Sequence, residues 1–161
     1  MTGRARVFGN DINTDYIITS RRKRESLDPA VLRHYVFEEL DAGFAVTVEA
    51  GDWIVAGKNF GCGSAMEVAV TALLGAGIRA VAACSFSRTY FRNAVNNGLL
   101  PLECDTSGIG EGDRLTLADG QVRNETTGKA VAAARAPEMM REIIAAGGLV
   151  NYFRLHGDFP A

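Results

Sequence analysis

The residues best suited to chemistry in this sequence gather in one glycine-rich segment, Gly57–Glu67. Ser64 follows glycines at positions 57, 61 and 63 and precedes a helix predicted over residues 65–74. The free N–H groups of a first helical turn, together with the helix dipole, bind anions. Glycines let the backbone approach a ligand because they carry no Cβ. The segment therefore predicts a loop in which Ser64 and nearby amides meet a carboxylate or a phosphate.

The same segment also has a purely structural interpretation. Ser64 and Glu67 have the spacing of a capping box, in which the two side chains satisfy backbone N–H groups of the helix start. Met66 replaces the last glycine of a dinucleotide fingerprint, and neither a phosphate-loop lysine nor a nucleophile elbow is present. From the local sequence alone, the functional and the capping interpretations are equally supported.

Two further groups of cations have the spacing to bind an anion. Arg88 and Arg92 are four residues apart in a helix predicted over residues 85–96, so their guanidinium groups share one face. The second group is a basic run that we expect to be an exposed loop: Arg21, Arg22, Lys23 and Arg24. The alternative for both groups is pairing with carboxylates on the surface.

Nucleophilic and metal chemistry have less support in the sequence. The three cysteines, Cys62, Cys84 and Cys104, form an odd count without a Cys-x-x-Cys pair. This pattern argues against a disulfide framework, a zinc knuckle and a self-contained iron–sulfur site. Neither His34 nor His156 stands at a motif spacing from a serine or a cysteine, so a serine or cysteine hydrolase is not indicated.

The elements that position the glycine-rich segment form an alternating pattern. Trp53–Ala56 is a continuous apolar run, as in a strand buried on both faces. Ile78–Cys84 is predicted as another buried strand, and each of the two precedes a predicted helix. Leu99–Leu102 is a further short strand, and Pro101 within it indicates the edge of a sheet. Strand–helix–strand–helix–strand order predicts a parallel α/β unit.

Flanking segments complete the predicted fold. Arg4–Phe8 and Phe44–Val48 have the patterns of strands, and Asp28-Pro29 is a helix start. After Asp105 the sequence favours short strands with hairpin turns. A final helix is predicted over Pro137–Ala146, ending at two glycines. The expected fold class is therefore α/β, with a parallel sheet core and a small β-rich portion.

Length and charge limit the function classes. The 161 residues correspond to one domain, and no linker divides them, so we expect a single domain over 1–161. Seventeen Lys and Arg against nineteen Asp and Glu give a net charge of −2, without the basic excess of nucleic-acid binders. No transmembrane run and no apolar signal segment is visible, so we expect a cytoplasmic protein without a membrane partner.

Four segments, in order along nearly the whole chain, resemble the small subunits of 3-isopropylmalate dehydratases. This family provides the separate swivel subunit of the aconitase superfamily. The matching segments are residues 11–18, 56–64, 85–101 and 146–152. The resemblance implies the aconitase-type swivelling β/β/α fold and a role in leucine biosynthesis.

The resemblance also implies a mechanism shared between two chains. In the family, a separate large subunit holds a [4Fe–4S] cluster through three cysteines, and the small subunit closes over it. By this resemblance the present chain binds no cofactor itself, and its partners are the large subunit and a small hydroxy acid. Ser64 matches the base that removes a proton next to a carboxylate. The implied substrate-binding residues are Gly61, Cys62, Gly63, Arg21, Arg22, Arg24, Arg88 and Arg92.

The chain departs from the family pattern beside Ser64. Where the family has Gly-Ser-Ser-Arg-Glu-His-Ala, Met66 replaces the arginine and Val68 the histidine. A methionine cannot hold a carboxylate through a charged fork. Arg21–Arg24 occupies the family's substrate-recognition loop, which carries Tyr-Leu in typical members. We therefore expect the hydro-lyase reaction with a substrate other than isopropylmalate. The alternative is a non-catalytic, anion-binding or regulatory relative with the same fold.

Overall fold

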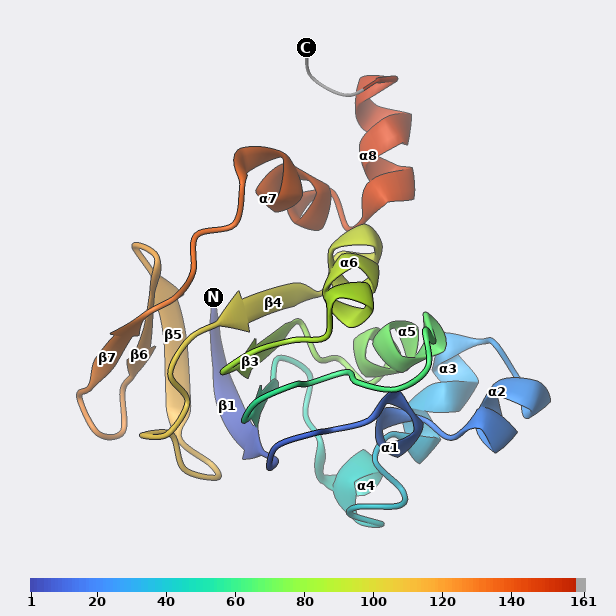
Figure 1. Ribbon diagram of the computed structural model, residues 1–161, viewed down its shortest axis with the longest axis horizontal. Helices are drawn as coiled ribbons and strands as arrows, with labels where there is room; N and C mark the ends of the chain where they lie inside the picture. Colours follow the sequence, from blue (N-terminus) through green and yellow to red (C-terminus); the bar gives the residue numbers. More distant parts are fainter. Residues whose placement is uncertain (159–161) are drawn as a thin grey trace.

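One seven-stranded sheet runs through the molecule (Figure 1). The structure is a computed structural model that describes residues 1–158. The strand order is β4-β3-β2-β1-β5-β6-β7. The strands are β1 (Thr2–Val7), β2 (Trp53–Ala56), β3 (Ala80–Ala83), β4 (Leu100–Glu103), β5 (Arg114–Ala118), β6 (Gln121–Asn124) and β7 (Ala130–Ala132). Strands β1 to β4 are parallel and β5 to β7 pair antiparallel, so the predicted α/β class with a parallel core is confirmed.

Helices cover one face of the parallel strands. They are α1 (Thr14–Ile17), α2 (Ser20–Glu25), α3 (Pro29–Leu32), the 3-10 helix η1 (Arg33–Tyr35), α4 (Phe44–Thr47), α5 (Val68–Gly75) and α6 (Arg88–Asn97). Ile54 of β2 and Val81 of β3 pack on this face with Leu73 of α5. Within the described residues, no helix combines the length and the apolarity needed to span a membrane.

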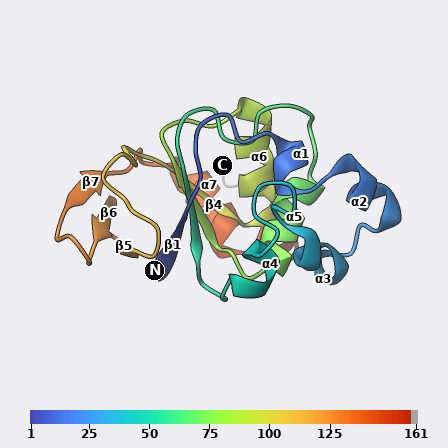
Figure 2. The same cartoon turned by 90° about the horizontal axis from the view of Figure 1, so that it is seen from below.

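The opposite face of the parallel strands is closed by the curl of the sheet itself. Trp53 and Val55 are buried there together with Leu115 of β5. Just after β7, the amide of Ala134 donates a 2.8 Å hydrogen bond to the carbonyl oxygen of Glu103 at the end of β4. This bond joins the two outer parts of the sheet. Figure 2 shows β5 to β7 grouped beyond β1, on the side away from α1 to α4.

The last two helices of the described chain are α7 (Glu138–Ala145) and α8 (Leu149–His156). Helix α7 confirms the helix predicted from Pro137 onwards. Sequence reasoning misses α8, because Gly147-Gly148 indicates a helix end and no capping side chain follows it. Tyr152 of α8 is buried against Val95 of α6 and Ile143 of α7. These contacts place α7 and α8 beside α6, as Figure 1 shows.

The strand predicted over Phe44–Val48 is wrong, because these residues begin with helix α4. The amide of Gly43 donates to Asp41 Oδ1 at 2.9 Å where the chain turns into this helix. Phe44 is completely buried, whereas Val46 is 89% exposed. Burial of one aromatic ring therefore outweighs the alternating pattern that predicts a strand.

The exposed loop predicted for the basic run is also wrong, because Arg21–Arg24 lies in helix α2. Thr19 Oγ1 accepts a hydrogen bond from the amide of Arg22 at 3.3 Å and caps the helix. The last turn is basic, and cations there interact favourably with the negative end of the helix dipole. The basic residues are therefore held at fixed positions on a helix and not on a loop.

The helix start at Asp28-Pro29 is confirmed, with Asp28 as the N-cap. The helix is shorter than expected and continues as η1, which ends at Tyr35. In this segment Leu32 is buried, whereas Val31 and Leu40 are each 44% exposed.

Candidate functional site

Three loops meet at the carboxyl ends of the parallel strands β1, β2 and β3. They cover residues 8–13, 57–67 and 84–87. The amide of Gly57 donates to the carbonyl oxygen of Gly9 at 3.1 Å, and the amide of Phe60 donates to that of Ser85 at 3.0 Å. Open α/β sheets bind ligands at this edge. The glycine-rich loop therefore lies where the fold favours a site.

Two glycines of this loop are required by close contacts. Gly61 has φ +75° and Gly63 has φ +89°, a left-handed region that residues with a side chain rarely adopt. A Cβ at Gly61 would collide with the ring of Tyr90, and one at Gly63 would collide with the side chain of Asn13. These glycines fix the path of the backbone that leads to Ser64.

Ser64 lies at an exposed bend and not at a helix start. Helix α5 begins at Val68, and no side chain caps it, so the predicted capping box of Ser64 and Glu67 is wrong. The carbonyl oxygen of Ser64 accepts a hydrogen bond from the hydroxyl of Thr14 at 2.9 Å. In a helix that started at Ser64, this oxygen would instead accept a backbone amide of the same helix. The Ser64 hydroxyl makes no hydrogen bond to any described residue.

The backbone amides around Ser64 are unpaired as well. Those of Gly63, Ser64 and Ala65 donate no hydrogen bond within residues 1–158. Consecutive N–H groups beside a left-handed residue form a concavity that binds anions. The amide of Gly61 is not available for this role, because it donates to the carbonyl oxygen of Ile12 at 2.8 Å. The Cys62 carbonyl oxygen likewise accepts the amide of Thr14, at 2.9 Å.

A polar turn before α1 supports the Ser64 loop, and sequence reasoning assigns it no functional residue. Asn13 Oδ1 accepts the amide of Asp15 at 2.9 Å and caps α1. Asp15 Oδ1 accepts the amide of Ser20 at 2.9 Å and its hydroxyl at 2.7 Å, and this joins α1 to α2. The sequence pattern that could have indicated this turn is the run of Asn, Thr and Asp, because these side chains form hydrogen bonds to the nearby backbone.

Met66, which the resemblance aligns with an arginine of the family, is part of the core. It is only 3% exposed, and its sulfur lies 3.8 Å from the hydroxyl oxygen of Ser20. Its neighbours in the apolar cluster include Ile17 and Ile18. Residue 66 therefore contributes an apolar, buried side chain beside the Ser64 loop.

Arg22 is held by two carboxylates. Its Nε and Nη2 donate to Glu38 at 3.0 and 2.9 Å, and its Nη1 donates to Glu25 at 2.9 Å. The guanidinium also stacks on Tyr35, 3.7 Å from the ring centroid. The Arg22 hydrogen bonds hold the pKa of the Glu38 carboxyl below its usual value. Because its charge is already balanced, Arg22 anchors α2 and does not offer a free cation to a substrate.

Arg21 and Arg24, in contrast, are exposed on the same helix. Arg21 Nη2 lies 3.9 Å from Glu38, with 62% of the Arg21 side chain exposed. Arg24 has no ion-pair partner among the described residues. The helix that carries them begins at Ser20, which touches Met66. Within the described chain, Arg24 is therefore an unpaired cation on the helix that contacts the Ser64 loop, and Arg21 is an exposed cation with one long ion pair.

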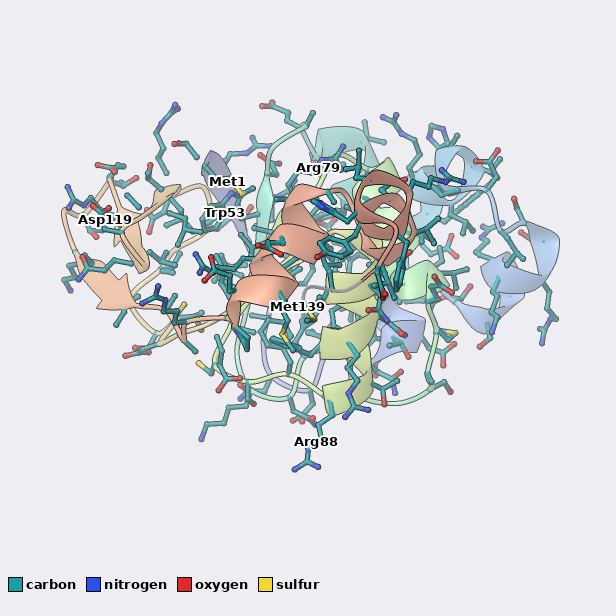
Figure 3. All side chains as sticks on the ribbon, turned by 90° about the horizontal axis from the view of Figure 1, so that it is seen from above. Met1, Trp53, Arg79, Arg88, Asp119 and Met139 are labelled. Carbon is teal, nitrogen blue, oxygen red and sulfur yellow. The ribbon has the colours of Figure 1, made fainter. Side chains whose placement is uncertain are left out.

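Arg88 and Arg92 share one face of α6, as predicted, and make no ion pair within residues 1–158. They line a depression of about 220 Å³ together with Phe86, Phe91 and Glu103. Figure 3 shows Arg88 directed away from the body of the molecule. This depression lies at the carboxyl ends of β3 and β4. Both cations therefore lie at the same end of the parallel strands as the Ser64 loop, but outside that loop.

The cysteines of this chain do not fit an iron–sulfur cluster. Across residues 1–158 no group of three or more His, Cys, Asp or Glu side chains is placed to hold a metal ion. Cys104 is 7% exposed, and burial raises the pKa of its thiol to about 11, which disfavours the thiolate that a metal requires. Cys62 and Cys84 are half-buried and free.

Comparison with known proteins gives consistent matches over this fold. Residues 19–107 match the family described as the aconitase C-terminal domain. The chain is 45% identical over 160 residues to the 3-isopropylmalate dehydratase small subunit 2 of Archaeoglobus fulgidus, covering 98% of this chain and 97% of that one. It is 43% identical over 156 residues to the isopropylmalate/citramalate isomerase small subunit of Methanocaldococcus jannaschii, covering 94% and 92%. A crystal structure of 3-isopropylmalate dehydratase from that organism superimposes with a TM-score of 0.92 at 41% identity, covering 97% and 94%.

Proposed function

This chain belongs to the aconitase C-terminal domain family, among the small subunits of 3-isopropylmalate dehydratases, and from this premise we propose how its site works. A small subunit implies a large-subunit partner. We propose that the two chains together dehydrate and rehydrate a small hydroxy acid. In this proposal the 161 residues act as one swivel domain that closes over the reaction site of the partner.

The observation that carries the proposal is the exposed Ser64 hydroxyl, which lies unpaired beside unpaired amides of Gly63 and Ala65. A serine hydroxyl is a weak base until it loses its proton, and nearby N–H groups stabilise the resulting alkoxide. In the proposed step Ser64 Oγ, present as the alkoxide, takes the proton from the carbon next to a substrate carboxylate and becomes a hydroxyl. The electron pair of the broken C–H bond forms the double bond, and the hydroxyl group on the neighbouring carbon leaves as hydroxide.

The chemistry on the departing hydroxyl belongs to the partner in this proposal. A [4Fe–4S] cluster on the large subunit would supply a Lewis acid that polarises the substrate hydroxyl. No cofactor is assigned to the present chain, whose cysteines do not fit a cluster. This chain binds the substrate carboxylate through the amides beside Ser64, holds the base and excludes water on closure.

The exposed cations of α2 support a substrate with an additional anionic group. We propose that Arg21 and Arg24 on α2 contact that group, since Met66 offers no charge and Arg22 is already paired. A substrate of this kind differs from isopropylmalate, whose side chain is apolar. Arg88 and Arg92, farther along the edge, raise the local concentration of anions without a defined contact.

The test is reconstitution. The chain is purified with its large subunit without oxygen and assayed on hydroxy acids with apolar or anionic side chains. We expect turnover, with kcat/KM highest for an anionic side chain. Arg21→Gln and Arg24→Gln should each raise the KM for that substrate about tenfold, the effect of losing one charge-assisted contact. Arg123→Gln, an exposed arginine on β6, is the matched control.

Two results would contradict the proposal. A stable complex without turnover on any hydroxy acid would favour the non-catalytic relative. Turnover highest on isopropylmalate, unchanged in the Arg21 and Arg24 variants, would show that the basic helix does not select the substrate. The first result rejects the activity and the second rejects only the substrate class.

A further inference from the structure

A second cavity lies at the amino-terminal ends of the parallel strands, whereas the Ser64 loop lies at their carboxyl ends. Its volume is about 590 Å³, within the range of small-molecule sites. It is lined by the start of β4, the end of β5 and the segment 133–136 that follows β7. In the parallel ladder, the first residue of β4 pairs with the first of β3, whereas the Ser64 loop follows the end of β2. The two sites are therefore at opposite ends of the parallel strands.

The walls of this cavity are apolar. Leu102 is 5% exposed, and Leu100, Leu117 and Ala133 are half-buried around it. The cavity exists because the sheet curls without closing fully. The bond between Ala134 and Glu103 joins the outer parts of the sheet at one end of β4, and the gap remains beside the first residues of β4.

Charged groups of both signs stand at the rim. Arg135 has no ion-pair partner among residues 1–158, and Arg141 is only 3.5 Å from the exposed Glu138. Asp119, at the β5–β6 turn, also makes no ion pair within the described chain. Figure 3 shows Asp119 on the hairpin and Met139 on α7, the two elements that flank the cavity. A ligand here meets both cations and a carboxylate at the rim.

An unpaired carbonyl group adds a second acceptor. The amide of Leu100 donates to the carbonyl oxygen of Arg79, so Leu100 directs its backbone groups toward β3. Alternate residues of a parallel strand direct theirs to opposite sides, and Pro101 therefore points its carbonyl oxygen outward from this edge strand. Pro101 lines the cavity, is buried, and has no N–H group of its own.

We propose that this cavity binds an α-amino acid with an apolar side chain. The ligand carboxylate would contact Arg135 and Arg141, and its ammonium group would contact Asp119 and the carbonyl oxygen of Pro101. The apolar side chain would lie among the leucines. A plain carboxylic acid leaves Asp119 unmatched, and an amine leaves both arginines unmatched, so the zwitterion is the ligand that complements the whole rim. The proposal does not depend on the catalytic role of Ser64.

The experiment is calorimetric titration of the full chain with L-leucine and L-phenylalanine, which represent two sizes of apolar side chain. Two analogues of leucine serve as comparisons. Isocaproate lacks the ammonium group, and isopentylamine lacks the carboxylate. We expect saturable binding of at least one amino acid, and binding at least about tenfold weaker for both analogues. Arg135→Gln and Asp119→Asn should each weaken amino-acid binding about tenfold, and Arg123→Gln should leave it unchanged.

The rim residues are exposed, so these variants should fold, and circular dichroism verifies this. Absence of saturable heat with both amino acids up to about 10 mM, the weak limit for a specific site, would overturn the proposal. Equal binding of isocaproate and leucine would also overturn it, because the ammonium group would then have no partner. An equal loss in Arg123→Gln and Arg135→Gln would likewise overturn it, because the effect would then come from net charge and not from a contact at the cavity.

Discussion

The hydroxyl group of Thr14 donates a 2.9 Å hydrogen bond to the carbonyl oxygen of Ser64, 50 residues away in the chain. Thr14 is 1% exposed, and the bond is partly buried because Ser64 itself is exposed. Because the Ser64 carbonyl oxygen accepts this bond, it is not used as an acceptor within a helix. The Ser64 hydroxyl makes no hydrogen bond to the described residues. The first turn of α1 thereby positions the proposed base.

Removal of this bond should loosen the Ser64 loop. Thr14→Val keeps the shape of the side chain and leaves the Ser64 carbonyl without its partner, at a cost of about 1–3 kcal/mol in folding free energy. We expect kcat of the two-subunit enzyme to fall while Thr14→Ser, which keeps the hydroxyl, retains it. Urea unfolding and steady-state kinetics measure the two effects. Wild-type kcat in Thr14→Val would show that this bond does not position the base.

Gly61 should tolerate no side chain. Gly61→Ala combines a left-handed backbone with a collision against the Tyr90 ring. Gly112 has a similar φ of +81°, but no atom lies within 4 Å of the place that its Cβ would take, so Gly112→Ala isolates the backbone cost. We expect about 1 kcal/mol of lost stability for Gly112→Ala and about 2–4 kcal/mol for Gly61→Ala. Equal losses in thermal or urea unfolding would mean that Tyr90 moves aside freely.

Met66 should act only through packing. Because its side chain is buried, Met66→Leu conserves volume and is expected to cost less than about 1.5 kcal/mol, with turnover nearly unchanged. Met66→Ala leaves a cavity and should cost about 2–5 kcal/mol. Urea unfolding gives the stabilities, and the reconstituted assay gives the turnover. A large loss of kcat in the stable Met66→Leu variant would reveal a role for the thioether in the reaction.

The ion pair between Arg22 and Glu38 predicts a pH dependence of stability. Hydrogen bonds from Arg22 hold the pKa of Glu38 below its usual value of 4.5. A carboxyl with a lowered pKa in the folded state stabilises the fold above its unfolded pKa and loses that effect as the pH falls through the folded pKa. Glu38→Gln should therefore be less stable than the wild type at pH 7, and the difference should shrink below about pH 4.5.

The control for this pH dependence is Glu39→Gln, which removes an exposed carboxylate with no ion-pair partner in the described chain. Its stability should follow that of the wild type between neutral and acidic pH. A constant difference between Glu38→Gln and the wild type over the whole range would show that the charge of Glu38 contributes nothing, and that only its shape matters.

The order of the core elements is readable from the sequence because their signals are local. Trp53–Ala56 is apolar at every position, and Pro101 marks an edge strand correctly. Where tertiary contacts compete, the local signal is misleading. Phe44–Val48 alternates like a strand, yet the burial of Phe44 makes it helical.

The site is only partly predictable for a similar reason. The glycine-rich loop follows from residue types, and the departure at Met66 is visible in the sequence, whereas the exposure of Ser64 is seen only in the structure. The capping box fails because Thr14, distant in the sequence, takes the Ser64 carbonyl. Arg22 looks like a free cation until the fold brings Glu38 to it. Contacts between distant residues decide which polar groups remain free, and no local pattern contains that information.

The most direct test of the account is the turnover of Ser64→Ala in the reconstituted two-subunit enzyme. The Ser64 hydroxyl makes no bond to the described residues, so the variant should fold, bind the large subunit and bind substrate as the wild type does. Ser107→Ala, at an exposed serine after β4, is the control. The account predicts that kcat falls by about 10²–10⁴-fold in Ser64→Ala alone, the range for loss of a general base. Unchanged kcat would contradict the account and leave Ser64 without a role in the reaction.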